Sequence, residues 1–212
     1  GQDIRGSQIS MIFQDPITSL NPTMNVGSQI AETLEVHRGY SKSEAFARAI
    51  ELLDMSKIPE AAKRATQYPF EFSGGMLQRA MIAMAIACEP AILVADEPTT
   101  ALDVTIQAQI LDLLGDLQKE TGMAIILITH DLGVVARMAD EVMVMYAGEV
   151  VEKGSVDDIF YRSGHPYTQG LRQAMPTNNK STEAEQTLVA IDGSPPDLFN
   201  PPRGCAYHPR CP

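Results

Sequence analysis

The sequence predicts an α/β protein whose core sheet is mainly parallel. Two apolar runs without polar alternation, residues 91–95 (AILVA) and 124–129 (AIILIT), predict strands buried on both faces. Residues 105–120 lie between them and place apolar side chains at helical spacing, which predicts a crossover helix. Strands separated by helices in this way form parallel sheets that helices cover on both faces.

The N-terminal part of the chain supplies one more strand. Residues 8–13 (QISMIF) form a short apolar run that predicts a strand. Residues 15–22 (DPITSLNP) are dense in turn-forming residue types and predict a loop. Gln14 therefore lies where the first strand ends.

The middle of the chain is predicted to be helical. From residue 26 to about residue 65, apolar side chains recur at helical spacing, and Ser41 with Glu44 forms a capping box. After a break in the periodicity, a second helical pattern covers residues 76–88. We therefore expect several helices before the strand at residues 91–95.

The C-terminal part of the chain differs from the rest in its pattern. Residues 142–146 and 149–152 flank Ala147 and Gly148, as the strands of a hairpin do. Beyond about Gly164 the chain is rich in Pro, Asn, Ser and Thr and has little periodicity. We expect an extended C-terminal tail there.

Composition limits the classes of function. The chain has 212 residues, with 27 acidic and 16 basic side chains and a net charge of −11. Binding to nucleic acid through a general basic field is therefore not expected. The longest apolar run, residues 80–88, is far shorter than the roughly 20 residues that span a bilayer. If the protein works at a membrane, we expect a peripheral subunit bound to a partner.

The cysteines and the two ends of the chain add two expectations. Cys88, Cys205 and Cys211 do not form a disulfide framework for a domain of this size, which indicates a reducing compartment. The chain starts at Gly1 rather than at a methionine, and it ends one residue after a cysteine. Both ends read as cut, so we expect a fragment of a longer protein.

A pair of carboxylates, Asp96 and Glu97, follows the apolar strand at residues 91–95. In parallel α/β sheets, ligands bind at the carboxyl ends of the strands. One carboxylate there can hold Mg²⁺, and its neighbour can polarise a water that attacks a phosphoryl group. The alternative is a strand that ends at a solvated acidic turn.

Ser73, Gly74 and Gly75 precede the helical pattern of residues 76–88. Two glycines let the backbone approach a ligand closely, and the free N–H groups of a helix N-terminus suit phosphate. The alternative is an ordinary helix start that is capped by a serine.

Two further polar residues follow apolar runs, Gln14 after the first strand and His130 after residues 124–129. A glutamine can ligate Mg²⁺ or position a water, and a histidine can hydrogen-bond a phosphate or orient a water. Either residue alone is more often structural, so the combination of all these signals decides the interpretation.

The order and spacing of these signals resemble those of one family. Gln14, FSGGM at residues 72–76, ILVADEP at residues 92–98, ALD at residues 101–103 and His130 resemble the ATP-binding cassette (ABC) ATPases. The resemblance covers roughly residues 9–154. It implies a P-loop NTPase-like nucleotide-binding domain that binds ATP and Mg²⁺ and hydrolyses the ATP. It also implies a helical subdomain at about residues 26–88 that docks on membrane subunits.

The resemblance assigns a role to each residue at the strand ends. Asp96 matches the aspartate that binds Mg²⁺, and Glu97 matches the catalytic base. Gln14 matches the glutamine that contacts Mg²⁺ and the attacking water. His130 matches the histidine that contacts the γ-phosphate.

The same resemblance implies that a second ATPase subunit completes the site. Ser73, Gly74 and Gly75 match the signature motif, which binds the γ-phosphate held by the opposite subunit of a dimer. Asp103 matches an aspartate at the dimer interface.

One departure from the family concerns the phosphate-binding loop. The family needs the string G-x-x-x-x-G-K-S/T upstream of the glutamine, and no such string occurs here. We therefore expect residues 1–163 to be a partial ABC ATPase domain without its Walker A part, and residues 164–212 to be a tail. We expect the fragment alone to be inactive, so the functional expectations describe the full-length protein.

Further strings indicate a branch of the family. Residues 15–22, residues 95–105 and HPYTQGL at residues 165–171 resemble ATPase subunits of bacterial dipeptide and oligopeptide importers, a group that includes nickel importers. The resemblance implies a peripheral subunit at the cytoplasmic face of the membrane that powers peptide import. Its partners would be a second ATPase subunit, identical or paralogous, the transmembrane permease subunits and, indirectly, a peptide-binding protein.

The end of the tail also resembles this branch, through CAYHPRCP at residues 205–212. In that group further cysteines follow, and the set can hold an iron–sulfur cluster such as 4Fe-4S, for which four thiolates are usual. Only Cys205 and Cys211 are present in this tail. Two alternatives to a cluster therefore stay open: the two cysteines bind zinc together with His208, or they bind no metal. Cys88, in an apolar helix, is expected to be a small buried hydrophobe.

Other functions stay open at this point. A non-transport ABC ATPase would usually show paired cassettes, a coiled-coil insertion or a basic surface, and the sequence shows none of these. A regulatory module without hydrolysis would often lack the residue matched by Glu97. Import of nickel or another small solute is the alternative to peptide import within the same family.

Overall fold

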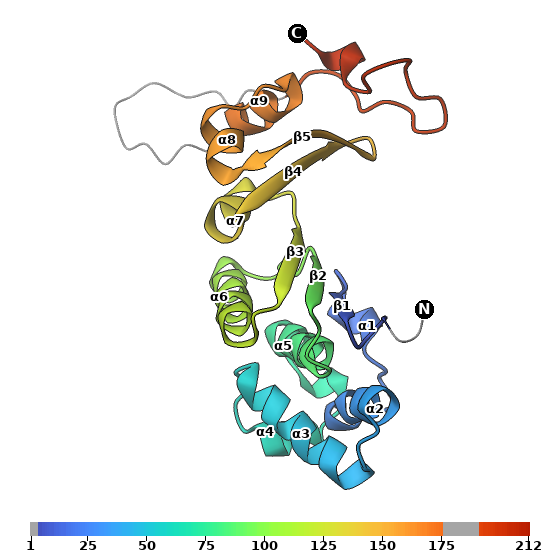
Figure 1. Cartoon of the computed structure of the whole chain (residues 1–212). Helices are drawn as coiled ribbons and strands as arrows, with labels where there is room; N and C mark the ends of the chain where they lie inside the picture. The colour runs from blue at the N-terminus through green and yellow to red at the C-terminus, as the bar shows by residue number, and fades with distance from the viewer. Residues whose placement is uncertain (1–3, 176–190) are drawn as a thin grey trace. The chain divides into compact units, whose positions relative to one another are not determined.

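The computed structural model (Figure 1) describes residues 4–175 and 191–212. The chain divides into two compact units, Gly1–His130 and Asp131–Pro212, and each is described by itself. The first unit contains every predicted site residue except the two tail cysteines, which belong to the second.

The first unit contains a three-stranded sheet in the order β1-β2-β3, with β1 at Ile9–Ile12, β2 at Ile92–Asp96 and β3 at Ala124–Ile128. Both strand pairings are parallel, and Met11, Val94 and Ile126 lie side by side in the register. The prediction of a parallel core sheet is therefore confirmed, and all three strands end at the same edge.

Helix α6 (Val104–Thr121) joins β2 to β3, as the sequence predicted. It buries Ile110, Leu113, Leu114 and Leu117, which recur at helical spacing on one face. The Asp103 carboxylate caps its first turn, and Gly122, with a φ of 71°, ends it in the left-handed conformation that favours glycine.

The helical region before β2 is built from α2 (Val26–Arg38), α3 (Lys42–Met55) and α4 (Ala61–Ala65), as Figure 1 shows. The predicted capping box of Ser41 and Glu44 is present at the start of α3. The turn η1 (Pro69–Glu71) leads from this region to the next helix.

Helix α5 (Gly74–Ile86) begins two residues before the predicted start at residue 76. The Ser73 hydroxyl accepts a hydrogen bond from the backbone N–H of Met76, so the cap lies further upstream than the apolar pattern indicated. The helix packs against α3 and β1 and buries most of its length, which makes it the centre of the first unit.

The segment predicted as a loop at residues 15–22 contains a one-turn helix, α1 (Pro16–Ser19). Its turn-forming residues have another use here, because the Asp15 carboxylate accepts from the N–H of Ile17 as an N-cap and Pro16 takes the first helical position. The loop prediction is therefore wrong for these four residues.

The prediction that helices cover both faces of the sheet is wrong for the described part of the chain. Ile12, Leu93 and Ala95 are buried on one face, whereas Met11, Ile126 and Ile128 on the other are 41%, 50% and 46% exposed. An unbroken apolar run indicates that both faces of a strand are apolar. It does not indicate which segment of the chain, if any, covers each face.

The second unit begins with α7 (Leu132–Met138) and the antiparallel hairpin of β4 (Glu141–Tyr146) and β5 (Glu149–Ser155), which confirms the predicted hairpin. Ala147 and Gly148 form its turn with φ values of 50° and 84°. Helix α8 (Val156–Tyr161) follows β5 at once, after the N-cap Ser155.

The tail predicted as extended beyond Gly164 contains helix α9 (Pro166–Gln173) and the turn η2 (His208–Arg210). Tyr207 packs edge-on against Tyr146 of β4, with ring centroids 5.2 Å apart, and lies 5.3 Å from the Tyr167 ring of α9. The sequence pattern did not predict that the tail packs on the hairpin, because the contact is made by three aromatic side chains and not by an apolar stripe along a helix. Part of the predicted tail, residues 176–190, lies outside the described residues.

Candidate active site

Glu97 lies directly after β2, at the edge where the parallel strands end. Its backbone N–H donates to the carbonyl of Ile128 on β3 at 2.9 Å, which continues the strand pairing by one residue. Its φ of 44° is in the left-handed region, where a residue with a Cβ is strained. Strain of this kind persists only where the surrounding structure holds it, so the backbone turns here against its own preference.

Three side chains donate to or contact the Glu97 carboxylate from different parts of the chain. The Gln14 Nε2 donates to Oε2 at 3.1 Å, and the Thr100 Oγ1 donates to the same oxygen at 2.7 Å. The His130 Nδ1 lies 3.1 Å from Oε1. The structure thus brings together Gln14, Glu97 and His130, which the sequence placed at the ends of three separate strands.

The contacts of Glu97 also stabilise its ionised form. Hydrogen bonds from Thr100 and then from His130 hold the pKa of the Glu97 carboxyl below its usual value of 4.5, against a small opposing effect of desolvation. Its side chain is 25% exposed, whereas that of His130 is 79% exposed. An ionised, partly accessible carboxylate can accept hydrogen bonds from a water molecule and polarise it.

Asp96 is the last residue of β2 and is half-buried beside Glu97. Among the described residues, no group of three or more His, Cys, Asp and Glu side chains could hold a metal by itself. Mg²⁺ does not need such a group, because it is usually held by one or two carboxylates together with waters and substrate phosphates. A Mg²⁺ site at this edge would therefore need from this chain only the oxygen atoms of Asp96 and Gln14, and waters and a nucleotide would complete it.

The residues Ser73, Gly74 and Gly75 lie at the start of α5, and Ser73 is exposed. A Cβ on Gly75 would come within 2.9 Å of the Ile106 Cγ2 of α6, so this glycine allows the two helices to approach each other. Asp103 caps α6 by accepting from the N–H of Ile106 at 3.0 Å. The two helix starts therefore lie next to each other, rather than in contact with the carboxylate of Glu97.

The contact of Thr100 with Glu97 was not predicted from the sequence. Its hydroxyl reaches Glu97 because the chain turns back between them, with the Thr100 N–H donating to the Glu97 carbonyl at 3.1 Å. The sequence does contain one feature that indicates this contact. Thr100 follows Glu97 by three residues, and the Pro98-Thr99 pair between them favours a turn that would bring the hydroxyl back to the carboxylate.

The cysteines of the second unit do not form a metal site within the described residues. The Cys205 Sγ lies 3.9 Å from the His165 Nε2, and both tail cysteines are exposed. Two thiolates are fewer than the four that an iron–sulfur cluster usually requires, so the described residues do not fit the cluster.

Cys88 behaves as the sequence predicted for a small buried side chain. It is 1% exposed, and its Sγ donates to the carbonyl of Thr33 at 3.8 Å. Burial raises the pKa of the Cys88 thiol above its usual value of 9.0.

In the described part of the chain, no helix combines the length and the apolar composition that a membrane span requires. The longest helix, α6, carries charged and polar residues along one side.

Two family models match the chain. One, described as "ABC transporter", matches residues 2–100, and the other, described as "Oligopeptide/dipeptide transporter, C-terminal region", matches residues 151–212. Together the two matches cover more than half of the chain.

Curated relatives align along almost the whole chain. The oligopeptide transport ATP-binding protein OppD of Haemophilus influenzae is 57% identical over 208 residues, which are 98% of this chain and 64% of that protein. OppD of Bacillus subtilis is 62% identical over 206 residues, which are 97% of this chain and 57% of that protein. The chain thus spans about three fifths of the length of these relatives.

Solved structures share the fold. The dimeric structure of the ATP-binding cassette MJ0796 in a post-hydrolysis state, bound to ADP and Pi, matches with a TM-score of 0.64 and 32% identity. The match covers 73% of this chain and 66% of that one. The cbiO1 protein of Clostridium perfringens, part of the ABC transporter complex cbiONQ, matches with a TM-score of 0.64 and 30% identity, over 74% of this chain and 60% of that one.

Proposed function

Because the chain belongs to the ABC transporter family, in the branch of the oligopeptide transport ATP-binding proteins, we propose that it is the larger part of an ATP-hydrolysing importer subunit. The observation that carries this proposal is the convergence of Gln14 and His130 on the two oxygens of Glu97. Three parallel strands deliver one of these side chains each to a single edge of the sheet. That edge is where α/β proteins bind their ligands.

Glu97 is the proposed general base. Its ionised carboxylate would accept a hydrogen bond from the attacking water and so increase the water's nucleophilicity toward the γ-phosphorus. His130, exposed at the end of β3, would donate to the γ-phosphate. The two side chains already lie within hydrogen-bond distance of each other, with the His130 Nδ1 3.1 Å from the Glu97 Oε1.

Asp96 and Gln14 are the proposed protein ligands of Mg²⁺, since both present oxygen atoms at the strand ends. When it is bound, Mg²⁺ supplies the charge that neutralises the phosphate oxygens. The two side chains orient that charge beside Glu97.

Ser73, Gly74, Gly75 and Asp103 are proposed to act across a dimer. The exposed start of α5 presents free backbone N–H groups and a serine hydroxyl, which suit the γ-phosphate of an ATP held by a second ATPase subunit. The dimeric MJ0796 structure supports such an assembly by its fold. Asp103 starts the neighbouring helix α6 and would lie at the same interface.

The partners follow from the branch of the family. We propose that residues 1–163 act as the ATPase domain and residues 164–212 as the branch-specific tail, which overlaps the match at residues 151–212. The helical region at residues 26–88 would dock on permease subunits at the cytoplasmic face of the membrane, and a peptide-binding protein would act indirectly. The proposed solutes are oligopeptides, as in the name of the OppD relatives, with nickel or another small solute as the alternative.

An iron–sulfur cluster is a proposal for the full-length protein only. Cys205 and Cys211 could supply two thiolates, and further cysteines would have to supply the rest. No step of the proposed ATPase reaction involves this region.

The experiment that tests the proposed function is transport in vesicles by the full-length protein together with its second ATPase subunit, the permease subunits and the peptide-binding protein. We expect labelled oligopeptide to enter the vesicles only with Mg-ATP on the subunit's side, and peptide to stimulate ATP hydrolysis. Hydrolysis without uptake of any peptide or of Ni²⁺ would instead indicate a non-transport ABC ATPase.

A further inference from the structure

The Thr100 hydroxyl makes the shortest side-chain hydrogen bond to Glu97 in the described part of the chain. Its Oγ1 lies 2.7 Å from Oε2, whereas the Gln14 Nε2 lies 3.1 Å from the same oxygen. A hydroxyl that donates to a carboxylate at this distance is a charge-assisted hydrogen bond, which is about twice as strong as a neutral one.

This hydroxyl is held in place by the turn that follows β2. The Thr100 N–H donates to the Glu97 carbonyl at 3.1 Å, so backbone and side chain close the same turn. The Thr99 carbonyl accepts from the Gln107 Nε2 at 3.0 Å, which ties the turn to α6. Threonine is branched at Cβ and restricted at χ1, so its hydroxyl loses little freedom on making the bond.

The Glu97 carboxylate needs such a restraint. The terminal torsion of a glutamate side chain has a broad energy profile, so a carboxylate rotates easily unless its oxygens are held. Gln14 and His130 approach it from the ends of β1 and β3, and they are the groups that we assign to Mg²⁺ and to the γ-phosphate. Thr100 belongs to the turn of Glu97 itself.

We propose that Thr100 is a positioning residue, whose hydroxyl fixes the orientation of the Glu97 carboxylate toward the attacking water. This inference rests on the proposed function, because it assigns Glu97 as the base. When Gln14 and His130 turn to the nucleotide, the hydrogen bond from Thr100 stays, since it does not depend on the position of another strand. Thr100 touches neither the substrate nor the metal in this role and acts through Glu97.

The test uses the full-length protein and three variants of this turn. Thr100→Val removes the hydroxyl at constant shape, Thr100→Ser keeps it, and Thr99→Val makes the same change at the neighbouring residue as a control. Loss of one hydrogen bond to a charged group predicts a fall in kcat of about tenfold for Thr100→Val. We expect KM for ATP, ATP affinity and Tm to stay unchanged, and Thr100→Ser and Thr99→Val to keep the wild-type kcat.

Combination with Glu97→Gln separates this inference from the proposed function. Once the base is absent, Thr100 has nothing to position, so adding Thr100→Val to Glu97→Gln should cause no further loss of kcat. If Thr100→Val does not fold, Thr100→Ala is measured in its place with the same expected result. A wild-type kcat in the folded hydroxyl-deletion variant, or a loss that Thr100→Ser shares, would overturn the role of Thr100 alone. Full turnover in Glu97→Gln would overturn the assignment of the base.

Discussion

At the scale of single residues, the structure places local strain and polar contacts at the same point. Glu97 has a left-handed backbone with a φ of 44°, and Ala101, four residues later, has a φ of 63°. Such residues cost of order 1–3 kcal/mol each and persist where other contacts hold them. At Glu97 two backbone hydrogen bonds, to the Ile128 carbonyl and from the Thr100 N–H, act together with the side-chain bonds to its carboxylate to provide that restraint. The turn after β2 is therefore shaped by its polar contacts rather than by its own backbone preferences.

Gly75→Ala tests the close approach of α5 and α6. The added Cβ would lie 2.9 Å from the Ile106 Cγ2, which is attached to a branched carbon and cannot swing away. Overpacking of this kind costs about 1–3 kcal/mol, which outweighs the gain of up to about 1 kcal/mol in helix propensity. We expect a loss of about 1 kcal/mol in the free energy of unfolding, measured by urea denaturation.

Gly115→Ala is the matched control for this prediction. Gly115 lies within α6, and a Cβ there would meet no heavy atom within 4 Å. We expect this variant to be more stable by up to about 1 kcal/mol, because only the propensity gain applies. Equal stabilisation by both substitutions would show that α5 and α6 do not approach closely at Gly75.

Part of the site was predictable at this scale, and part was not. The convergence of Gln14, Glu97 and His130 followed from their positions after apolar runs, because the carboxyl ends of parallel strands share one edge. The contact of Thr100 with Glu97 depends on a left-handed backbone at a non-glycine residue. Local residue preferences argue against that conformation, so a sequence pattern does not reveal it.

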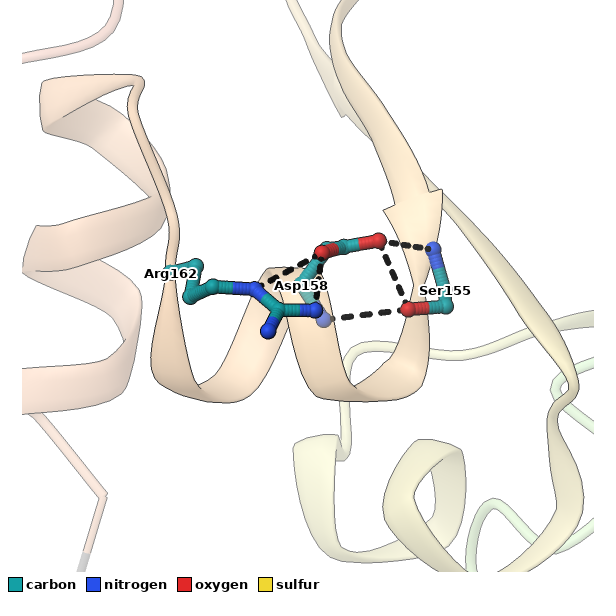
Figure 2. Close-up of polar contacts among 3 residues, drawn as sticks. All are labelled: Ser155, Asp158 and Arg162. Atoms are coloured by element: carbon teal, nitrogen blue, oxygen red, sulfur yellow. Dashed lines mark hydrogen bonds and ion pairs between the residues drawn. The ribbon is translucent and has the colours of Figure 1, made fainter.

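At the scale of elements, helix α8 shows how one carboxylate fixes a helix start. Asp158 Oδ2 accepts from the backbone N–H and the hydroxyl of Ser155, at 3.2 Å and 2.7 Å (Figure 2). Its other oxygen accepts from both Nε and Nη2 of Arg162, at 3.0 Å and 2.7 Å. A single side chain therefore joins the capping box to an ion pair one turn later.

The pH dependence of the second unit follows from these contacts. The hydrogen bond from the Ser155 side chain, followed by those from Arg162, lowers the pKa of Asp158 below its usual 3.8. A carboxyl group whose folded-state pKa is depressed stabilises the fold above its unfolded pKa. That stabilisation is lost as the pH falls through the folded-state value. We therefore expect stability to fall below pH 3.8 partly because Asp158 becomes protonated.

Asp158→Asn isolates this contribution from the other carboxylates. The variant should be less stable than the wild type at pH 6, and the difference should shrink as the pH falls below 3.8. Thermal unfolding at a series of pH values measures it. A difference between the two proteins that is independent of pH would contradict the role of the ionised carboxylate.

The elements themselves were largely predictable. The strands of the sheet, the helices of the helical region and the hairpin appear where the periodicity placed them, because buried faces impose periods of 3.6 and 2. Helix α1 was missed because its four residues are too few to show a period. Helix α9 was missed because its eight residues include Pro166 and Gly170 and bury only Thr168, so they show little apolar periodicity. Its start is fixed instead by the His165 ring, which accepts from the Tyr167 N–H.

At the scale of the whole molecule, the second unit depends on contacts between segments far apart in the sequence. Arg210 donates to the Tyr146 hydroxyl at 3.2 Å and to the carbonyls of Ile191 and Asp192 at 2.9 Å and 2.8 Å. Tyr207 is 3% exposed between Tyr146 and Tyr167. The C-terminal segment is therefore part of the core of this unit, which no local sequence pattern could indicate.

Tyr207→Ala should release the C-terminal segment from the hairpin. Removal of a buried aromatic side chain costs about 3–5 kcal/mol, which is a large share of the stability of a small unit. We expect trypsin to cleave after Arg210 much faster in this variant, because the Arg210 side chain loses its protected position. Tyr161→Ala, at a tyrosine that is 77% exposed, is the control and should leave the cleavage rate unchanged.

We propose that Glu97, oriented by its neighbours at the strand ends, is the general base in ATP hydrolysis. The most direct measurement is the rate at which bound Mg-ATP is hydrolysed by the full-length Glu97→Gln variant, beside Glu120→Gln at an exposed position as a control. We predict that Glu97→Gln binds ATP as the wild type does and hydrolyses it about 10²- to 10⁴-fold more slowly, whereas Glu120→Gln is unaffected. Hydrolysis by Glu97→Gln at the wild-type rate would contradict the account.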